Sequence, residues 1–253
     1  MEVPLRVSPD GTRITFGSDR DGRPGIWICN MDGSNLYKLA EGEGTTAWSH
    51  DAASITFDQA VDGNTDLYIV AADGGKPRRL TSEPSIDGTP EFSRDGRWLY
   101  FTSTRAAHTA QIWRMPAGGG PAVQITRNGG FRPRESPDGL HLYYLDRLVS
   151  VNGRGKLMRT PVTGGDETVV LDDIGGWTWD ASDVGILFST SDKTGIAVDV
   201  LRYGDLKTIR IGRLDFNPAR TAVGWAVSRD GRWLATTQLD RLDSDLMLVD
   251  NFR

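Results

Sequence analysis

The stretch that decides the fold is Val7-Ser8-Pro9-Asp10-Gly11-Thr12-Arg13-Ile14-Thr15-Phe16. A Pro-Asp-Gly turn follows the end of one strand and precedes a second strand in which polar and apolar residues alternate. Proline presets the backbone for a tight turn, the aspartate accepts backbone N–H groups, and glycine tolerates a positive φ. We therefore expect two antiparallel strands joined at this turn.

The same pattern recurs along the whole chain. Its third turn residue falls at positions 10, 51, 95, 138, 182 and 230, so the copies lie 41 to 48 residues apart, and the copy near residue 182 is decayed. A period of about 40–45 residues is typical of a four-stranded β-propeller blade. Six copies of one turn around a ring indicate a scaffold rather than six active sites. The residues assigned to structural turns are Asp10, Gly11, Asp51, Asp95, Gly96, Asp138, Gly139, Asp230 and Gly231.

Each copy divides into four strands, which in the first copy cover about 4–8, 13–18, 25–30 and 35–39. The sixth copy ends after its third strand, and residues 1–8 align with an inner strand. We therefore expect a fragment, or a chain whose closing strand lies upstream. The prediction is a single all-β domain over residues 1–253, a six-bladed β-propeller of four-stranded antiparallel blades whose last blade lacks its outer strand. The expected blades are 1–43, 44–86, 87–129, 130–174, 175–218 and 219–253.

Composition excludes several classes of protein. The net charge is −5 with no basic run, so we expect no nucleic-acid partner. No run of about 18 apolar residues exists, so no membrane span is expected, and the N-terminus lacks a signal segment. The single cysteine, Cys29, lies in an apolar strand and is expected to pack in the core. We expect a monomer.

A family resemblance follows from the first copy. Ser-Pro-Asp-Gly-x-x-Ile-x-Phe, Ser18-Asp19-Arg20-Asp21-Gly22, Ile26-Trp27-Ile28 and Asp32-Gly33-Ser34-Asn35-Leu36 resemble the TolB-like β-propeller family. Segments 124–130, 237–240 and 245–253 look like the C-terminal propellers of bacterial CadC-like winged-helix regulators or serine/threonine kinases. The resemblance implies a sensory or interaction module of a larger signalling protein, in the periplasm or otherwise outside the cytoplasm. It identifies no ligand.

Catalytic signatures are missing from the sequence. There is no Gly-x-Ser-x-Gly elbow, and His50, His108 and His141 lack the spacing of zinc ligands. The acidic runs Asp62-Gly63-Asn64-Thr65-Asp66 and Asp240–Asp245 resemble the start of a calcium loop, but Asp and Asn of this kind usually cap turns. We therefore expect no metal, no cofactor and no enzymatic activity.

Recognition should lie where the copies differ, because a propeller scaffold repeats. The fourth inner strand, Phe131-Arg132-Pro133-Arg134-Glu135-Ser136, carries three charges where its sister strands carry mostly small or apolar residues. Arg132, Arg134 and Glu135 either form an internal salt bridge or contact an anion at the mouth of the channel. The loop 146–156 adds Arg147 and Arg154 as further binding candidates.

The leading hypothesis is a non-catalytic, protein- or ligand-binding propeller of a signalling protein, the ligand being a protein or a small molecule. The first alternative is a TolB-like periplasmic scaffold that binds an envelope protein. The second is an enzyme of the polysaccharide-lyase or hydrolase type that uses channel residues. A channel that holds only apolar residues and satisfied ion pairs would exclude this enzyme.

Overall fold

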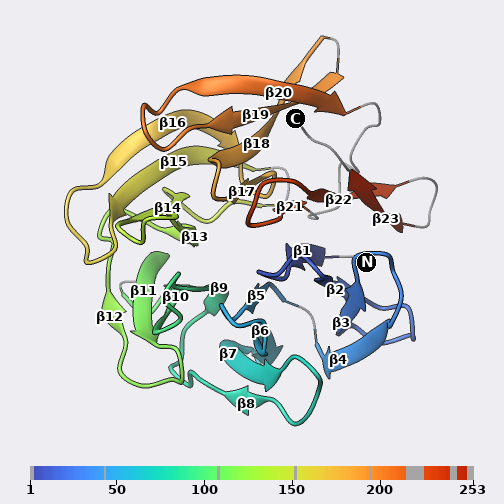
Figure 1. Ribbon diagram of the computed structural model, residues 1–253. Coiled ribbons are helices and arrows are strands. Elements are labelled where there is room, and N and C mark those ends of the chain that lie inside the picture. Colours follow the sequence, from blue (N-terminus) through green and yellow to red (C-terminus); the bar gives the residue numbers. More distant parts are fainter. Residues whose placement is uncertain are drawn as a thin grey trace.

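The computed structural model describes residues 3–42, 44–106, 109–150, 153–193, 195–214, 225–239 and 244–249, which form antiparallel sheets arranged around a common centre (Figure 1). The first sheet contains β1 (Val3–Val7), β2 (Arg13–Ser18), β3 (Gly25–Asn30) and β4 (Tyr37–Glu41). The second contains β5 (Thr46–Trp48), β6 (Ser54–Val61), β7 (Asn64–Ala71) and β8 (Arg78–Arg79). The third contains β9 (Asp87–Phe92), β10 (Trp98–Ser103), β11 (Gln111–Pro116) and β12 (Val123–Gln124).

The second half of the chain repeats this arrangement. The fourth sheet contains β13 (Phe131–Glu135), β14 (His141–Leu145), β15 (Arg154–Pro161) and β16 (Thr168–Gly175). The fifth contains β17 (Trp179–Ala181), β18 (Ile186–Asp192), β19 (Gly195–Leu201) and β20 (Thr208–Leu214). The last sheet contains β21 (Trp225–Val227), β22 (Leu234–Leu239) and β23 (Ser244–Val249). Within every sheet the strands are hydrogen-bonded in sequence order.

The prediction of a six-bladed propeller is corrected by this topology. The described residues form five four-stranded blades, not six, and the sixth copy of the turn yields a sheet of three strands. The physical reason is that strand pairing in the last unit stops at β23, since no other described strand pairs with its free edge. The predicted four strands per blade agree with the five complete sheets, and β1 is an inner strand as expected.

The inner strands form a closed ring. β1 contacts β5, β5 contacts β9, and the contacts continue through β13, β17 and β21 back to β1. This arrangement buries the faces of each sheet against its neighbours, because an isolated sheet could not cover both of its faces. A separate apolar cluster fills each of the six spaces between sheets. One cluster joins Leu5 and Phe16 of the first sheet to Ala226 and Ala235 of the last, and it includes the predicted core residue Cys29.

The repeated turn is held by its own side chains. Ser8 Oγ donates to Asp10 Oδ1 at 2.6 Å and accepts the backbone N–H of Arg13 at 2.9 Å. Gly11 has a φ of +70°, which an L side chain rarely adopts. The same serine–aspartate bond joins Ser49 to Asp51, Ser93 to Asp95, Ser136 to Asp138 and Ser228 to Asp230. The turns therefore fix the end of each inner strand, which is where the candidate site lies.

Candidate binding site at the mouth of the channel

A cavity of about 110 Å³ lies at the turn end of the inner strands. All six inner strands contribute to it, together with the turns that follow β1, β5, β9 and β21. The walls combine apolar side chains with a set of charged ones. The apolar lining residues include Val7, Trp48, Phe92, Ala181 and Val227, and the charged ones are Arg6, Glu91, Arg94, Arg134, Asp180 and Arg229.

Arg134 is at the centre of the charged set. Its Nε donates to Asp180 Oδ1 at 2.6 Å, and its Nη1 lies 3.3 Å from Glu91 Oε2 while donating to the carbonyl of Pro133 at 2.7 Å. Asp180 also accepts the backbone N–H of Val227 at 3.3 Å. Arg134 is only 2% exposed. Three inner strands, β9, β13 and β17, are thus joined through one guanidinium group.

Arg132 lies deeper and points to the neighbouring blade. Its Nη1 donates to the carbonyl of Gly176 at 2.7 Å, and its guanidinium carbon lies 4.8 Å from the ring centre of Trp177 and 5.6 Å from that of Trp179. Burial lowers the pKa of Arg132, which is 1% exposed. Arg132 therefore braces the contact between β13 and the segment before β17, and it does not line the cavity.

Glu135 does not pair with either arginine of its strand. Neighbouring side chains of a strand point to opposite faces, so Arg134 and Glu135 diverge. Glu135 instead accepts the backbone N–H of Arg94 at 3.2 Å, and burial raises its pKa to about 7. In place of an internal salt bridge, Arg134 pairs with Asp180 at 2.6 Å and lies 3.3 Å from the carboxyl group of Glu91, both on other strands.

The loop candidates lie away from this site. β14 runs from the turn towards the opposite end of its blade, so the loop after Leu145 lies at the end remote from the mouth. Arg147 pairs there with Asp146 at 3.0 Å, and Arg154 pairs with Asp173 at 2.6 Å. The structure therefore brings only Arg134, of the five predicted binding residues, to the cavity wall.

A charged rim surrounds the mouth, formed by residues that directly follow the turn serines. In the fifth copy the structure places Ser182, which comes directly after β17, in the role of the turn serine and not at the third turn position expected above. Arg94 Nη1 donates to Asp183 Oδ1 at 2.7 Å, and Arg229 Nε lies 3.6 Å from Asp183 Oδ2. Arg229 Nη1 and His50 Nδ1 are 2.9 Å apart. These contacts join turns of four different sheets, so we use the name mouth rim for His50, Arg94, Asp183 and Arg229.

Sequence reasoning missed most of the charged set because it considered the fourth inner strand alone. The signal was present in the alignment of the copies. The position two residues before the turn serine is charged in four of the six copies, namely Arg6, Glu91, Arg134 and Asp180. The opposite charges at this position predict mutual pairing across a ring, and the rim residues show the same alternation.

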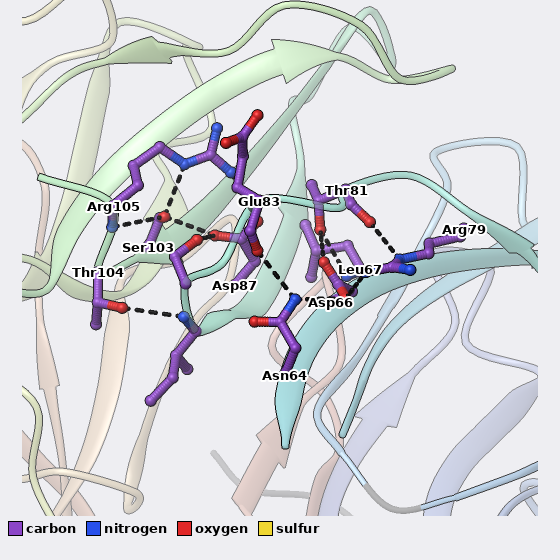
Figure 2. Close-up of polar contacts among 12 residues, drawn as sticks. Asn64, Asp66, Leu67, Arg79, Thr81, Glu83, Asp87, Ser103, Thr104 and Arg105 are labelled. Carbon is purple, nitrogen blue, oxygen red and sulfur yellow. Dashed lines mark hydrogen bonds and ion pairs between the residues drawn. The ribbon is translucent and has the colours of Figure 1, made fainter. Parts of the chain in front are cut away.

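A second polar cluster lies around Asp87 at the start of β9, the end remote from the mouth (Figure 2). Asp87 is fully buried and accepts hydrogen bonds from Ser103 Oγ at 2.5 Å, Ser85 Oγ at 3.1 Å and Arg105 Nη2 at 2.6 Å. Asp66 nearby accepts from Asn64, Thr81 and Arg79. Both carboxylates are thus engaged by protein donors, and the cluster is structural. The acidic run 62–66, considered above as the start of a calcium loop, contributes Asp66 to this cluster.

The histidines and the acidic runs considered above form no metal site in the described residues. Across these ranges no three His, Cys, Asp or Glu side chains are grouped so that they could hold a metal ion. His50 lies on the mouth rim and His141 in β14, whereas His108 and the run 240–243 lie outside the described residues. No helix in the described part of the chain is long and apolar enough to cross a membrane.

The family model of the TolB beta propeller domain matches residues 41–197, which is more than half of the chain. The chain belongs to the TolB β-propeller family. The match includes the second, third and fourth sheets and also β17 and β18 of the fifth, and therefore four of the six inner strands that line the cavity.

Curated relatives of this TolB β-propeller are longer than the chain. An uncharacterized protein of Agrobacterium fabrum is 28% identical over 182 residues, which cover 67% of this chain and 61% of that protein. The Tol-Pal system protein TolB of Bordetella pertussis is 36% identical over 119 residues, covering 46% of this chain and 27% of that protein. The chain thus spans less than two thirds of the relatives that it matches.

Solved structures agree with the fold. TolB from Acinetobacter baumannii superposes with a TM-score of 0.69 at 18% identity, over 85% of this chain and 55% of that one. An oligogalacturonate lyase from Vibrio parahaemolyticus gives 0.62 at 12% identity, over 97% of this chain and 73% of that one. At these identities both likenesses show the fold alone.

Proposed function

We propose that this TolB β-propeller is a non-catalytic protein-binding module of the bacterial envelope, whose partner is another component of a Tol-Pal system. The observation that carries the proposal is the similarity to TolB proteins of that system, together with the match to the TolB beta propeller domain over residues 41–197. A location outside the cytoplasm follows from the same relationship.

The geometry supports a binding surface at the mouth rim. Arginine and histidine side chains from turns of three sheets surround a cavity with an aromatic and aliphatic wall. Arginine and aromatic side chains dominate the binding energy of protein interfaces. The rim is built on turns that are held by serine–aspartate bonds, so the partner would meet a preorganised surface.

The carboxyl groups of the cavity support an enzymatic role less well than a binding role. Asp180 is held by Arg134 and by a backbone N–H, and Glu91 lies against the same guanidinium group. Carboxylates engaged in this way are not free to act as general base or nucleophile. The signalling role and the CadC-like or kinase resemblance stay predictions, because the relatives named above give them no support.

The proposal is tested by calorimetric titration of the purified chain with each Tol-Pal component of its own organism. Replacing Arg94 and Arg229 together by glutamate reverses the charge of the mouth rim and should weaken binding at least tenfold, since like charges then face the partner. Arg154→Glu, at the remote end of the fourth blade, is the matched control and should bind like the wild type. Absence of binding to every component, or equal binding by both variants, would contradict the proposal.

A further inference from the structure

Two arginines that line the cavity carry N–H groups that no protein atom satisfies. Nη2 of Arg134 and Nε of Arg6 are buried and have no hydrogen-bond partner in the protein. Both side chains line the cavity, and the two residues are 2% and 8% exposed. Buried donors without a partner are rare in native proteins and point to a ligand or ordered water.

The charge of the cavity is positive. Arg6, Arg94, Arg134 and Arg229 line it, whereas Asp180 is the one aspartate of its lining and Asp183 pairs with the two arginines of the rim. Four arginines thus meet two aspartates, and the excess favours an anion.

Glu91 does not cancel this excess, because even an ionised Glu91 leaves four arginines against three carboxylates. Burial raises its pKa to about 8, an effect that Asp180 and Glu135 add to and that Arg6 and Arg94 oppose. Burial thus favours the neutral, protonated form of this carboxyl group. In that state it is a hydrogen-bond donor to an anion rather than a competing charge.

Size and wall chemistry define the class of anion. An engineered apolar cavity of about 150 Å³ holds benzene, so a cavity of about 110 Å³ accepts a smaller group. The planar guanidinium fork matches a carboxylate, which accepts two parallel N–H bonds. Trp48, Phe92 and Val227 line the cavity beside the arginines and suit a short hydrocarbon chain better than a third or fourth anionic oxygen.

We propose that the cavity binds a single carboxylate on a short aliphatic chain, held by Arg134 and Arg6. The carboxylate belongs either to a free acid of two to four carbon atoms or to an acidic side chain of a bound protein segment. The proposal rests on the cavity alone and does not require the Tol-Pal partner proposed above.

The test is an NMR titration of the full chain with ¹³C-labelled propionate, with sodium chloride added to keep the ionic strength constant. A ligand of so few atoms binds weakly, so saturable binding with a Kd on the order of millimolar is expected. Ala181→Leu fills the cavity without removing a charge and should abolish binding. Arg97→Gln changes an exposed arginine outside the cavity lining and should leave the Kd unchanged.

Arg134→Lys should weaken binding at least tenfold, because lysine keeps the charge but loses the fork. If this variant does not fold, Ala181→Leu still decides the question. The peptide acetyl-Gly-Glu-Gly-amide separates the two sources: binding of the peptide but not of propionate assigns the site to a protein side chain, and the reverse assigns it to a free acid. Binding of neither, binding that survives Ala181→Leu, or equally tight binding of sulfate would overturn the proposal.

Discussion

Asp180→Ala should destabilise the TolB β-propeller by about 3–5 kcal/mol, the usual loss when one partner of a buried ion pair is removed. Asp180 is 4% exposed and accepts from Arg134 Nε at 2.6 Å and from the backbone N–H of Val227 at 3.3 Å. It also lies 3.7 Å from Arg6 Nη1. Alanine would leave two buried guanidinium groups and one backbone donor without this acceptor, so the charges of two strands would lose a buried counter-ion.

The measurement is equilibrium unfolding in urea at pH 7, followed by the fluorescence of the eight tryptophans. The stability change is taken at an unchanged m-value, so that it reports the folded state. Asp183→Ala is the matched control, because this side chain is 45% exposed and its pair with Arg94 lies on the rim. We expect it to cost at most about 1 kcal/mol. Equal losses for the two variants, or a loss below about 1 kcal/mol for Asp180→Ala, would refute the argument from the buried network.

Three further predictions concern other buried polar groups. Because the folded-state pKa of Glu91, about 8, exceeds the ordinary value of 4.5, its contribution to stability is complete below pH 4.5 and is lost as the pH rises through 8. In the wild type this loss of stability amounts to at most about 1.4 kcal/mol per pH unit between pH 4.5 and 8, and Glu91→Gln should remove it. Melting temperatures that depend on pH identically in the wild type and in Glu91→Gln would contradict the prediction. Asp87→Ala should cost about 2–4 kcal/mol in urea unfolding, since Arg105 loses its buried partner, whereas near-zero cost would show that the cluster of Figure 2 is dispensable. Arg132→Met should cost about 1–3 kcal/mol through the loss of the Gly176 hydrogen bond and the aromatic contacts, and a stabilised variant would disprove this role.

Much of the fold could be predicted because its information is local and repeated. The Ser-x-Asp-Gly turn is closed by its own side chains, and the strands beside it alternate in polarity, so β2 and β3 of the structure coincide with the predicted ranges. The predicted number of blades was wrong, because the pairing of the last sheet depends on which strand meets β23 rather than on the turn. A count of turns is therefore not a count of blades.

The candidate site was less predictable because its contacts are distant in sequence. Arg94 and Asp183 are 89 residues apart, and Arg229 and His50 are 179 apart, so no local pattern reveals that they meet. Arg134 was predicted because its charge is unusual for an inner strand, but Glu135 of the same strand was the one protein partner considered for it. The alternation of strand faces points Arg134 and Glu135 apart, so this pair does not form.

Site-directed photo-cross-linking in cells tests whether the mouth rim binds a protein partner. A photoreactive amino acid is placed at position 50, on the rim, and in a control at position 148, an exposed site in the loop at the remote end of the fourth blade. We expect a cross-link to a Tol-Pal component from position 50 and none from position 148. A cross-link to such a component from position 148 alone, or from neither position, would contradict it.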